Sequence, residues 1–291
     1  EKQTYSHASV LENTAKAAFE AGYTVGFART LHDIDEKEDI SKFRNRMRKT
    51  VALQKSETGR YLLKKQKISI IVPIYNEEST IESLQKQLIP LLDKSEILFV
   101  DGGSKARTLS MIDSRFRVLH SEKGRANQMN LGAKESSGDI LLFLHSDSEL
   151  PKHPLAEIRY VMKDHLAGCF GIAFHSYNFF MFTCRVISNH RIKDRKVMFG
   201  DQGIFIDRKL FFEVGKFPEM PILEDYQFSL TLKERGIPLG MTRHRLYTSD
   251  RRFVGNTIEK LKVMWLMNRL RAMYRDGVPA EEIAKIYKDI R

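Results

Sequence analysis

Cysteine is scarce in this sequence, and long apolar runs are missing. The 291 residues include two cysteines, Cys169 and Cys184, which are too few for a disulfide framework and lack the paired spacing of a zinc site. No uninterrupted apolar run approaches the roughly 18 residues that a membrane-spanning helix needs, and the first residues do not resemble a secretory signal peptide. We therefore expect a cytoplasmic protein with two reduced thiols.

Acidic residues are fewer than basic ones. The chain has 37 Asp and Glu against 48 Lys and Arg, which gives a formal net charge of +11 at pH 7. A basic balance suits nucleic acid, an anionic membrane face or a phosphate-bearing substrate. Because no zinc-finger or RRM signature is present, we expect no nucleic-acid partner. A solvated basic surface explains part of the excess charge.

The first 66 residues lack a Gly-rich phosphate loop, which a complete nucleotidyltransferase domain places after its first strand. The spacing of apolar residues predicts a helix over residues 9–21, a strand over 23–28 and a basic helix over 41–66. We expect residues 1–66 to form this αβα appendage and residues 67–291 to form the main domain.

Residues 33–40 of the appendage, Asp-Ile-Asp-Glu-Lys-Glu-Asp-Ile, resemble the closing motif of nucleotidyltransferase-like domains related to molybdenum-cofactor guanylyltransferases. Only the last part of such a domain is present, and the sequence begins at Glu1 instead of Met, so we expect a fragment. Asp33 and Asp35 are then expected to act in helix capping and turn formation and not as ligands.

The main domain alternates short apolar runs with helical stretches, which predicts βαβ units and a mostly parallel sheet flanked by helices, an α/β fold. The run 140–144 is apolar throughout and is expected to be buried on both faces. His145, Ser146 and Asp147 follow it directly. Ligands bind at the carboxyl ends of the strands in open α/β sheets, so we expect the functional site there.

Six motifs of the main domain occur in a characteristic order. They are IVPIYNE from Ile71, VDGGS from Val100, GRANQMNLG from Gly124, FLHSD from Phe143, GDQG from Gly200 and LED from Leu223. Together they resemble family 2 glycosyltransferases, and the resemblance runs from about Lys67 to the C-terminus. It implies the GT-A fold, a Rossmann-like fold of nucleotide-diphospho-sugar transferases. The GRANQMNLG, FLHSD and GDQGIF forms are similar to a small bacterial subgroup often described with selenium or arsenosugar metabolism.

The resemblance implies transfer of a sugar from a nucleotide-diphosphate sugar, often a UDP-sugar, to a hydroxyl acceptor, aided by Mg²⁺ or Mn²⁺. Asp147 falls on the last aspartate of the family's Asp-x-Asp motif, and His145 stands at the first position. A metal held by one carboxylate and one imidazole favours Mn²⁺. The alternative is that His145 only packs or forms hydrogen bonds beside the site.

The resemblance also assigns residues to the donor and the acceptor. The donor is expected to contact Pro73, Tyr75, Glu77, Asp101, Arg125, Ser146, Arg251 and Arg252. Glu77 has an alternative role as an acid at a helix start. Gly102 and Ala106 stand where the family has further acids, so the identity of the nucleotide stays open.

An inverting transfer needs a carboxylate that takes the proton of the acceptor hydroxyl. Asp225 matches the family's catalytic base, and we expect Glu224 to support it. Asp201 and Gln202 are expected to line the acceptor side, although Gln202 is equally compatible with an ordinary polar loop. The paired arginines Arg251 and Arg252 stand in place of the Gln-x-x-Arg-Trp motif of processive synthases, which predicts single transfer and not polymerisation.

Residues 257–275 are expected to form a basic amphipathic helix. Its apolar residues alternate with Lys and Arg, so it suits a peripheral contact with the inner membrane face or a homodimer contact. Packing on the catalytic domain is the favoured alternative, because the apolar face of such a helix usually meets the core. The alternative functions are a nucleotidyltransferase and a non-catalytic protein that binds nucleotide-sugars. The nucleotidyltransferase is disfavoured because the sequence after Val72, Pro-Ile-Tyr-Asn-Glu, is not a Gly-rich phosphate loop.

Overall fold

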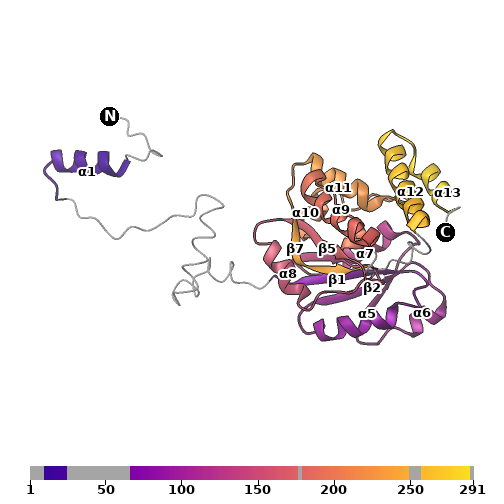
Figure 1. Cartoon of the computed structure of the whole chain (residues 1–291). Coiled ribbons are helices and arrows are strands. Elements are labelled where there is room, and N and C mark those ends of the chain that lie inside the picture. Colours follow the sequence, from indigo (N-terminus) through magenta and orange to yellow (C-terminus); the bar gives the residue numbers. More distant parts are fainter. Residues whose placement is uncertain (1–9, 25–65, 176–178, 249–256, 289–291) are drawn as a thin grey trace. The chain divides into compact units, whose positions relative to one another are not determined.

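The computed structural model describes residues 10–24, 66–175, 179–248 and 257–288. The chain divides into two units, Glu1–Lys65 and Gln66–Arg291, which are described separately. In the first unit the described element is helix α1 (Val10–Glu20), which confirms the predicted N-terminal helix (Figure 1). The other predictions for this unit, including Asp33, Asp35 and the basic helix, lie outside the described residues.

The second unit contains one seven-stranded sheet in the order β3-β2-β1-β4-β6-β5-β7. Its strands are β1 (Ile68–Ile74), β2 (Glu96–Asp101), β3 (Arg117–His120), β4 (Ile140–Phe143), β5 (Ala167–Ala173), β6 (Ile204–Asp207) and β7 (Leu239–Tyr247). The neighbouring strands are parallel except that β6 runs antiparallel to both β4 and β5. The predicted α/β fold with a mostly parallel sheet is therefore confirmed.

Helices cover both faces of this sheet (Figure 1). They are α5 (Ile81–Leu88), α6 (Ala106–Ser110), α7 (Arg125–Glu135), α8 (Pro154–Val161), α9 (Phe179–Arg195), α10 (Arg208–Glu213), α11 (Glu224–Glu234), α12 (Thr257–Arg275) and α13 (Ala280–Lys288). Side chains of a strand point alternately to opposite faces, so one apolar run can supply two cores.

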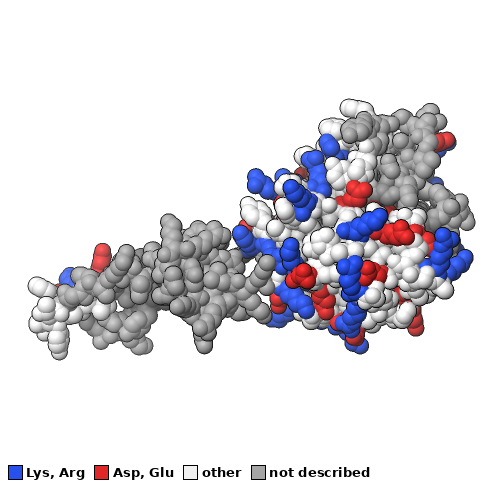
Figure 2. Space-filling model, turned by 90° about the horizontal axis from the view of Figure 1, so that it is seen from below, with Lys and Arg blue, Asp and Glu red and all other residues white. Residues whose placement is uncertain are grey.

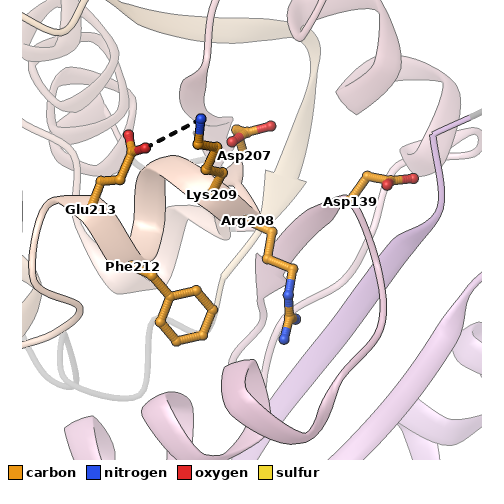
Figure 3. Close-up of a pocket in the computed structure, with 6 residues that line it drawn as sticks. All are labelled: Asp139, Asp207, Arg208, Lys209, Phe212 and Glu213. Carbon is orange, nitrogen blue, oxygen red and sulfur yellow. Dashed lines mark ion pairs between the residues drawn. The ribbon is translucent and has the colours of Figure 1, made fainter. Parts of the chain in front are cut away.

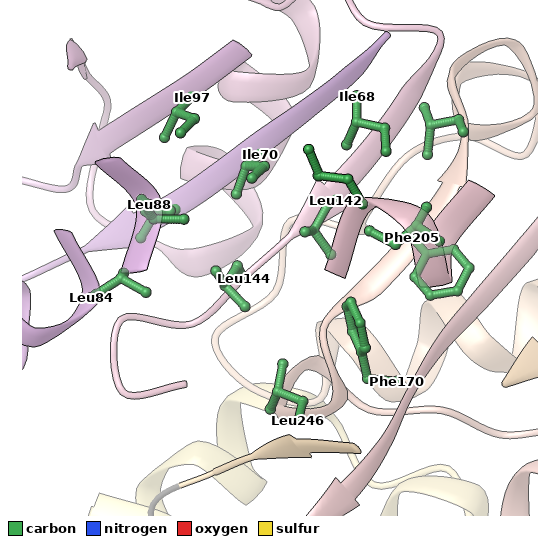
Figure 4. Packing of buried hydrophobic residues seen from close by; sticks show 14 of the residues in the cluster. Ile68, Ile70, Leu84, Leu88, Ile97, Leu142, Leu144, Phe170, Phe205 and Leu246 are labelled. Carbon is green, nitrogen blue, oxygen red and sulfur yellow. The ribbon is translucent and has the colours of Figure 1, made fainter. Parts of the chain in front are cut away.

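One core lies between the sheet and helices α5 and α8 (Figure 4). It includes Ile70 and Leu142 from the central strands and Leu84 and Leu88 from α5, each at most 1% exposed. The other core lies against α7, α10 and α11. There the Phe143 ring centroid is 4.8 Å from that of Phe217.

Gly132 allows α7 to lie close to the sheet. A Cβ atom at this position would be 2.4 Å from Cγ2 of Ile71 and 3.0 Å from Cγ2 of Val100. Real Cβ atoms do not approach so closely. A glycine is therefore required for α7 to sit at this distance from β1 and β2, and α7 in turn carries Arg125 at its first residue.

The C-terminal helices pack on the main domain through a third, smaller core. Leu270 of α12 and Ile283 of α13 are both 0% exposed and pack with Leu223 and Tyr226 of the α11 region. The inner face of α12 therefore packs on the catalytic domain, as one of the predicted alternatives has it. Trp265, on the same helix, is 62% exposed.

Charge on the second unit is mixed. On the face shown in Figure 2, Lys and Arg side chains are interspersed with Asp and Glu side chains. Within the described ranges, no helix is both long enough and apolar enough to cross a membrane.

Parallel strands bring several loops to one edge of the sheet. The chain leaves β1 for β2 and β3 on one side and returns to β4 on the other side of β1. The loops after β1, β2 and β4 therefore meet where the strand order changes direction, and this is where open α/β sheets bind ligands.

Candidate functional site

The loops after β1 and β2 are held together by three polar residues. The backbone N–H of Asn76 donates to Oγ of Ser104 at 2.9 Å, and the N–H of Lys105 donates to Oδ1 of Asn76 at 2.9 Å. Asn76 has φ 54°, a conformation that asparagine tolerates better than most residues. These bonds join the loops after β1 and β2 at the edge of the sheet where the nucleotide is predicted to bind.

Asp101 is occupied by its own loop. The side chain is buried, and it accepts hydrogen bonds from the backbone N–H groups of Gly103 at 3.1 Å and Ser104 at 3.0 Å. Burial alone would raise the pKa of Asp101, but the hydrogen bonds from Ser104 and Gly103 outweigh it and hold the pKa below its ordinary value. The negatively charged Asp101 side chain therefore holds this loop in place beside the predicted nucleoside position.

Two polar residues of α7, Gln128 and Asn130, are buried and form hydrogen bonds with backbone groups of other segments. Nε2 of Gln128 donates to the carbonyl oxygens of Ile74 and Val100, both at 2.7 Å. The side-chain amide of Asn130 pairs with the backbone of Phe217 in both directions, at 2.8 and 3.1 Å. Both side chains therefore serve the scaffold: Gln128 joins the ends of β1 and β2, and Asn130 joins α7 to the segment after α10.

Tyr75 and Lys123 form a second contact across this edge. Nζ of Lys123 donates to the hydroxyl of Tyr75 at 3.1 Å and lies 4.2 Å from the ring centroid. The hydrogen bond and the charge of Lys123 lower the pKa of the Tyr75 hydroxyl. Of the other predicted donor residues in this loop, Pro73 is half-buried within β1, and Glu77 is half-buried and accepts from the Thr80 hydroxyl at 3.2 Å.

The loop after β4 is held on both sides. The N–H of Ser148 donates to the carbonyl of His145 at 3.2 Å, which closes a turn with Ser146 and Asp147 between them. Glu149 then bonds to Tyr247 of β7 in both directions, at 2.7 and 2.9 Å. Ser146 is buried and Asp147 is half-buried. The fixed turn holds the predicted metal-binding carboxylate at the end of β4.

His145, Gly200 and Asp225 converge from three elements. A Cβ atom at Gly200 would lie 2.8 Å from Nε2 of His145 and 3.2 Å from Oδ2 of Asp225. The N–H of Gly200 donates to that same Oδ2 at 2.7 Å. The end of β4, the turn before β6 and the start of α11 therefore meet at Gly200, where a larger residue would displace the His145 ring.

The turn at Gly200–Gln202 holds its own shape. Oε1 of Gln202 accepts from the N–H of Phe199 at 3.1 Å, and Gln202 is 0% exposed. This burial favours the structural alternative for Gln202. Asp201 is half-buried and is the more accessible of the two predicted acceptor-side residues. Gly203 ends the turn with φ 61°.

Glu224 and Asp225 open α11 directly after a strained residue. Leu223 has φ 67°, which is unfavourable for a bulky side chain. Glu224 then turns into the protein and is 4% exposed, with Oε1 3.3 Å from Nη1 of Arg125. Burial and the neighbouring charge of Asp225 raise the pKa of Glu224, and Arg125 opposes them.

The raised pKa of Glu224 predicts a pH-dependent effect on stability. A carboxyl whose pKa is raised by folding stabilises the native state below its unfolded pKa and loses that contribution as pH rises through the folded pKa. In a Glu224→Gln variant this loss is absent. We therefore expect its melting temperature, relative to wild type, to be higher at pH 8 than at pH 4.

Thermal unfolding monitored by circular dichroism at both pH values checks this prediction. Glu213→Gln is the matched control, because Glu213 is an exposed carboxyl paired with Lys209 at 3.6 Å, and exposed pairs contribute little. A Glu224→Gln variant whose relative melting temperature is the same at pH 4 and pH 8 would contradict the raised pKa.

The residues at the end of β4 were predicted to hold a divalent metal. Within the described ranges, no group of three or more His, Cys, Asp or Glu side chains could hold a metal ion. Mg²⁺ and Mn²⁺ bind through one or two carboxylates and take further oxygens from substrate phosphates. Asp147 suits that role, whereas Nε2 of His145 is buried against Gly200 and favours the packing alternative. The residues therefore fit a cation that arrives with the diphosphate.

Two predicted donor residues, Arg251 and Arg252, lie outside the described residues. Two other arginines near Asp225 were not predicted as site residues. Arg191 was not singled out in the sequence, and Arg271 was assigned to the basic face of a helix. Both approach Phe199, the residue before Gly200, with guanidinium carbons 4.0 and 5.1 Å from its ring centroid.

A surface pocket elsewhere on the sheet is distinct from this site. It is lined by Asp139, Asp207, Arg208, Lys209, Phe212 and Glu213 (Figure 3). Asp139 precedes β4 and Asp207 ends the antiparallel β6, so the pocket lies at the amino end of β4. The loops that meet at Gly200 lie at the opposite end of that strand.

Comparison with known proteins identifies relatives of this chain. An uncharacterized glycosyltransferase of Haemophilus influenzae (strain ATCC 51907 / DSM 11121 / KW20 / Rd) is 26% identical over 184 residues, 57% of this chain and 61% of that protein. The glucosyl-3-phosphoglycerate synthase of Mycobacterium tuberculosis (strain CDC 1551 / Oshkosh) is 38% identical over 102 residues, 30% of this chain and 31% of that protein. The chain thus spans less than two thirds of the length of these relatives.

A solved structure and a family match agree with the fold. The crystal structure of S. aureus TarS 1–349 has a TM-score of 0.50 at 20% identity and covers 69% of this chain and 64% of that chain. This likeness concerns the fold and confirms the predicted GT-A architecture. Residues 69–217 match the family described as Glycosyl transferase family 2. Because this match extends over more than half of its residues, the chain belongs to glycosyl transferase family 2.

Proposed function

We propose that the chain is an inverting glycosyltransferase that moves a sugar from a nucleotide-diphosphate sugar to a hydroxyl acceptor. The observation that carries the proposal is the convergence of Asp225, Gly200 and the loop of Asp147 at the carboxyl edge of the sheet, in a chain of this family. Crystals of TarS 1–349 were obtained in complex with UDP-GlcNAc, which supports UDP-GlcNAc as the first donor to test.

Asp225 is the proposed general base. The acceptor oxygen attacks the anomeric carbon and forms the new C–O bond, while the bond to the diphosphate oxygen breaks and its electron pair leaves with the nucleotide. Oδ1 or Oδ2 of Asp225 takes the acceptor proton. The N–H groups of Gly200 and Tyr226, at 2.7 Å each, hold this carboxylate in one orientation, so it is oriented before the substrate binds.

Asp147 is the proposed ligand for Mn²⁺ or Mg²⁺, with Ser146 beside it. A divalent cation there would neutralise the charge that develops on the departing diphosphate. Arg125, which is 40% exposed although paired with Glu224, is placed to add positive charge. Tyr75, Glu77 and Asp101, with Pro73, are proposed to form the nucleoside end.

UDP-GlcNAc binding tests the donor and the metal together. We expect isothermal titration calorimetry to show binding that is at least about tenfold tighter with Mn²⁺ than with EDTA, equivalent to ~1.4 kcal/mol. In Asp147→Asn this dependence on metal should disappear. Asp139→Asn is the control, because Asp139 lies at the opposite end of β4.

Other outcomes of the calorimetry favour other functions. Equal affinity with Mn²⁺ and with EDTA would contradict the metal assignment. No heat with any nucleotide-sugar, with or without metal, would favour a non-catalytic role for the chain.

We propose that the exposed face of α12 contacts either a membrane surface or a second copy of the chain. Trp265 and Leu261 are 62% and 47% exposed, and Arg269 lies 5.4 Å from the Trp265 ring centroid. Exposed aromatic and basic side chains on one helix suit an anionic membrane surface. The cytoplasmic location stays a prediction from the sequence.

A further inference from the structure

An arginine–aromatic cluster adjoins the proposed base, and its members are Arg191, Phe199, Tyr226, Arg271 and Arg275. The rings of Phe199 and Tyr226 stack with centroids 5.8 Å apart and planes 3° apart. The guanidinium carbons of Arg191 and Arg271 lie 4.0 and 5.1 Å from the Phe199 centroid. Nη1 of Arg275 donates to the Tyr226 hydroxyl at 3.1 Å.

Backbone connections fix this cluster next to Asp225. Phe199 directly precedes Gly200, whose N–H donates to the Asp225 carboxylate, and Tyr226 directly follows Asp225. The two aromatic residues are therefore immediate chain neighbours of the groups that orient the base. Any anion held by the guanidinium groups on Phe199 would lie close to the reacting hydroxyl.

One of the two arginines on Phe199 has a buried donor without a hydrogen-bond partner among the described residues. Nε of Arg191 is buried and has no hydrogen-bond partner in the described part of the chain. Arg271 donates from Nη2 to Oδ1 of Asn268 at 2.6 Å, which uses one of the five N–H groups that an arginine offers. The buried Nε of Arg191 can therefore donate a hydrogen bond to a ligand oxygen.

The electrostatics also favour an additional anion. Burial, with a smaller contribution from the nearby charge of Arg271, lowers the pKa of Arg191 to about 10 against the opposing charges of Asp201 and Asp225. Burial likewise lowers the pKa of Arg271. Two like charges held partly out of water repel each other. A bound phosphate or carboxylate would relieve this repulsion through charge-assisted hydrogen bonds.

The topology separates this cluster from the nucleotide end. The loops with Tyr75, Asn76 and Asp101 follow β1 and β2, whereas α9 follows β5 and the turn at Gly200 precedes β6. In the sheet, β4 lies between these two halves. An anion on Arg191 and Arg271 is thus on the side of the base and the acceptor, away from the nucleoside.

We propose that Arg191 and Arg271 bind an anionic group of the acceptor, a phosphate or a carboxylate, beside Asp225. The acceptor is then an acidic hydroxyl compound, and the two arginines determine specificity for it. This inference rests on the proposed function, because it assumes that the hydroxyl reacts at Asp225. Arg275 stabilises the aromatic pair and has no direct part in binding.

Inorganic phosphate is the probe for this site. We expect phosphate, titrated by calorimetry into protein saturated with UDP and Mn²⁺, to bind at a site that UDP does not occupy. Arg191→Gln and Arg271→Gln should each weaken phosphate binding by about tenfold or more, as expected for the loss of a charge-assisted contact, and leave UDP affinity unchanged. Arg269→Gln, an exposed arginine on the same helix, is the control and should change neither affinity.

Three outcomes would overturn the proposal: no phosphate binding to wild type that binds UDP, unchanged phosphate affinity in both variants, or a loss of UDP affinity in place of phosphate affinity. The last result would assign the arginines to the donor diphosphate. If Arg191→Gln does not fold, Arg191→Lys keeps the charge but loses the planar fork, and reduced phosphate affinity is expected there too. Wild type that binds phosphate but not UDP would contradict the proposed function and not the anion site.

Discussion

Replacing Asp225 with Asn is expected to lower kcat for sugar transfer by about 10²–10⁴-fold, the usual contribution of a positioned general base. Asn has one carbonyl oxygen, so it can keep the hydrogen bond from Gly200 but must give up the one from Tyr226. The fold and the donor affinity should therefore change little. The measurement is UDP release at saturating donor, with and without a hydroxyl acceptor.

The control for this experiment is Asp276→Asn, because Asp276 follows α12 and is exposed. Its kcat should equal that of wild type, and UDP-GlcNAc affinity should be the same in both variants and wild type. Full transfer activity in Asp225→Asn at saturating donor would remove Asp225 as the base. Loss of donor affinity in proportion to kcat would instead assign the carboxylate to substrate binding.

Gly132→Ala is expected to destabilise the protein by about 1–3 kcal/mol, the usual cost of overpacking a core. Helix propensity acts in the opposite direction, since Gly→Ala in a helix interior normally stabilises by about 1 kcal/mol. The steric term should win, because the new Cβ would meet Cγ2 of Ile71 at 2.4 Å and β1 is central in the sheet. Chemical denaturation with urea measures the free energy of unfolding.

A double-mutant cycle with Ile71→Ala tests the cause. Removing the Ile71 branch creates space for the new methyl group, so the double variant should be more stable than the sum of the single effects predicts, by about 1 kcal/mol. Lys134→Ala, on the exposed side of α7, should change stability by less than about 0.5 kcal/mol. Additive effects, or a stabilised Gly132→Ala, would contradict the steric account.

Local patterns predicted the mostly parallel sheet but not its edge strand β7 or the antiparallel direction of β6. The run 140–144 is apolar and short, and its first four residues form the buried strand β4. Such a run is typical of a strand that helices cover on both faces. The motif order further placed Asp147 after β4 and Asp225 at the start of α11, as the structure has them.

Long-range geometry could not be predicted in the same way. Arg191 and Arg271 are 80 positions apart and share Phe199 as a partner, and no local spacing indicates such a meeting. Glu224 is buried and contacts Arg125, which lies 99 positions earlier in the chain. These features depend on the packing of whole helices, whose relative positions a single sequence does not specify.

The antiparallel strand β6 has a consequence for synthesis on the ribosome. A nascent chain that has emerged as far as α8 can already assemble β3, β2, β1 and β4 in their final order. One edge of β4 then stays unpaired until residues 204–207 emerge, because β6 is the strand that joins β4 to β5 and β7. Unpaired edges of apolar strands are templates for aggregation. During translation, the chain therefore exposes this edge of β4 in the interval between the synthesis of α8 and that of β6, before the proposed base Asp225 is made.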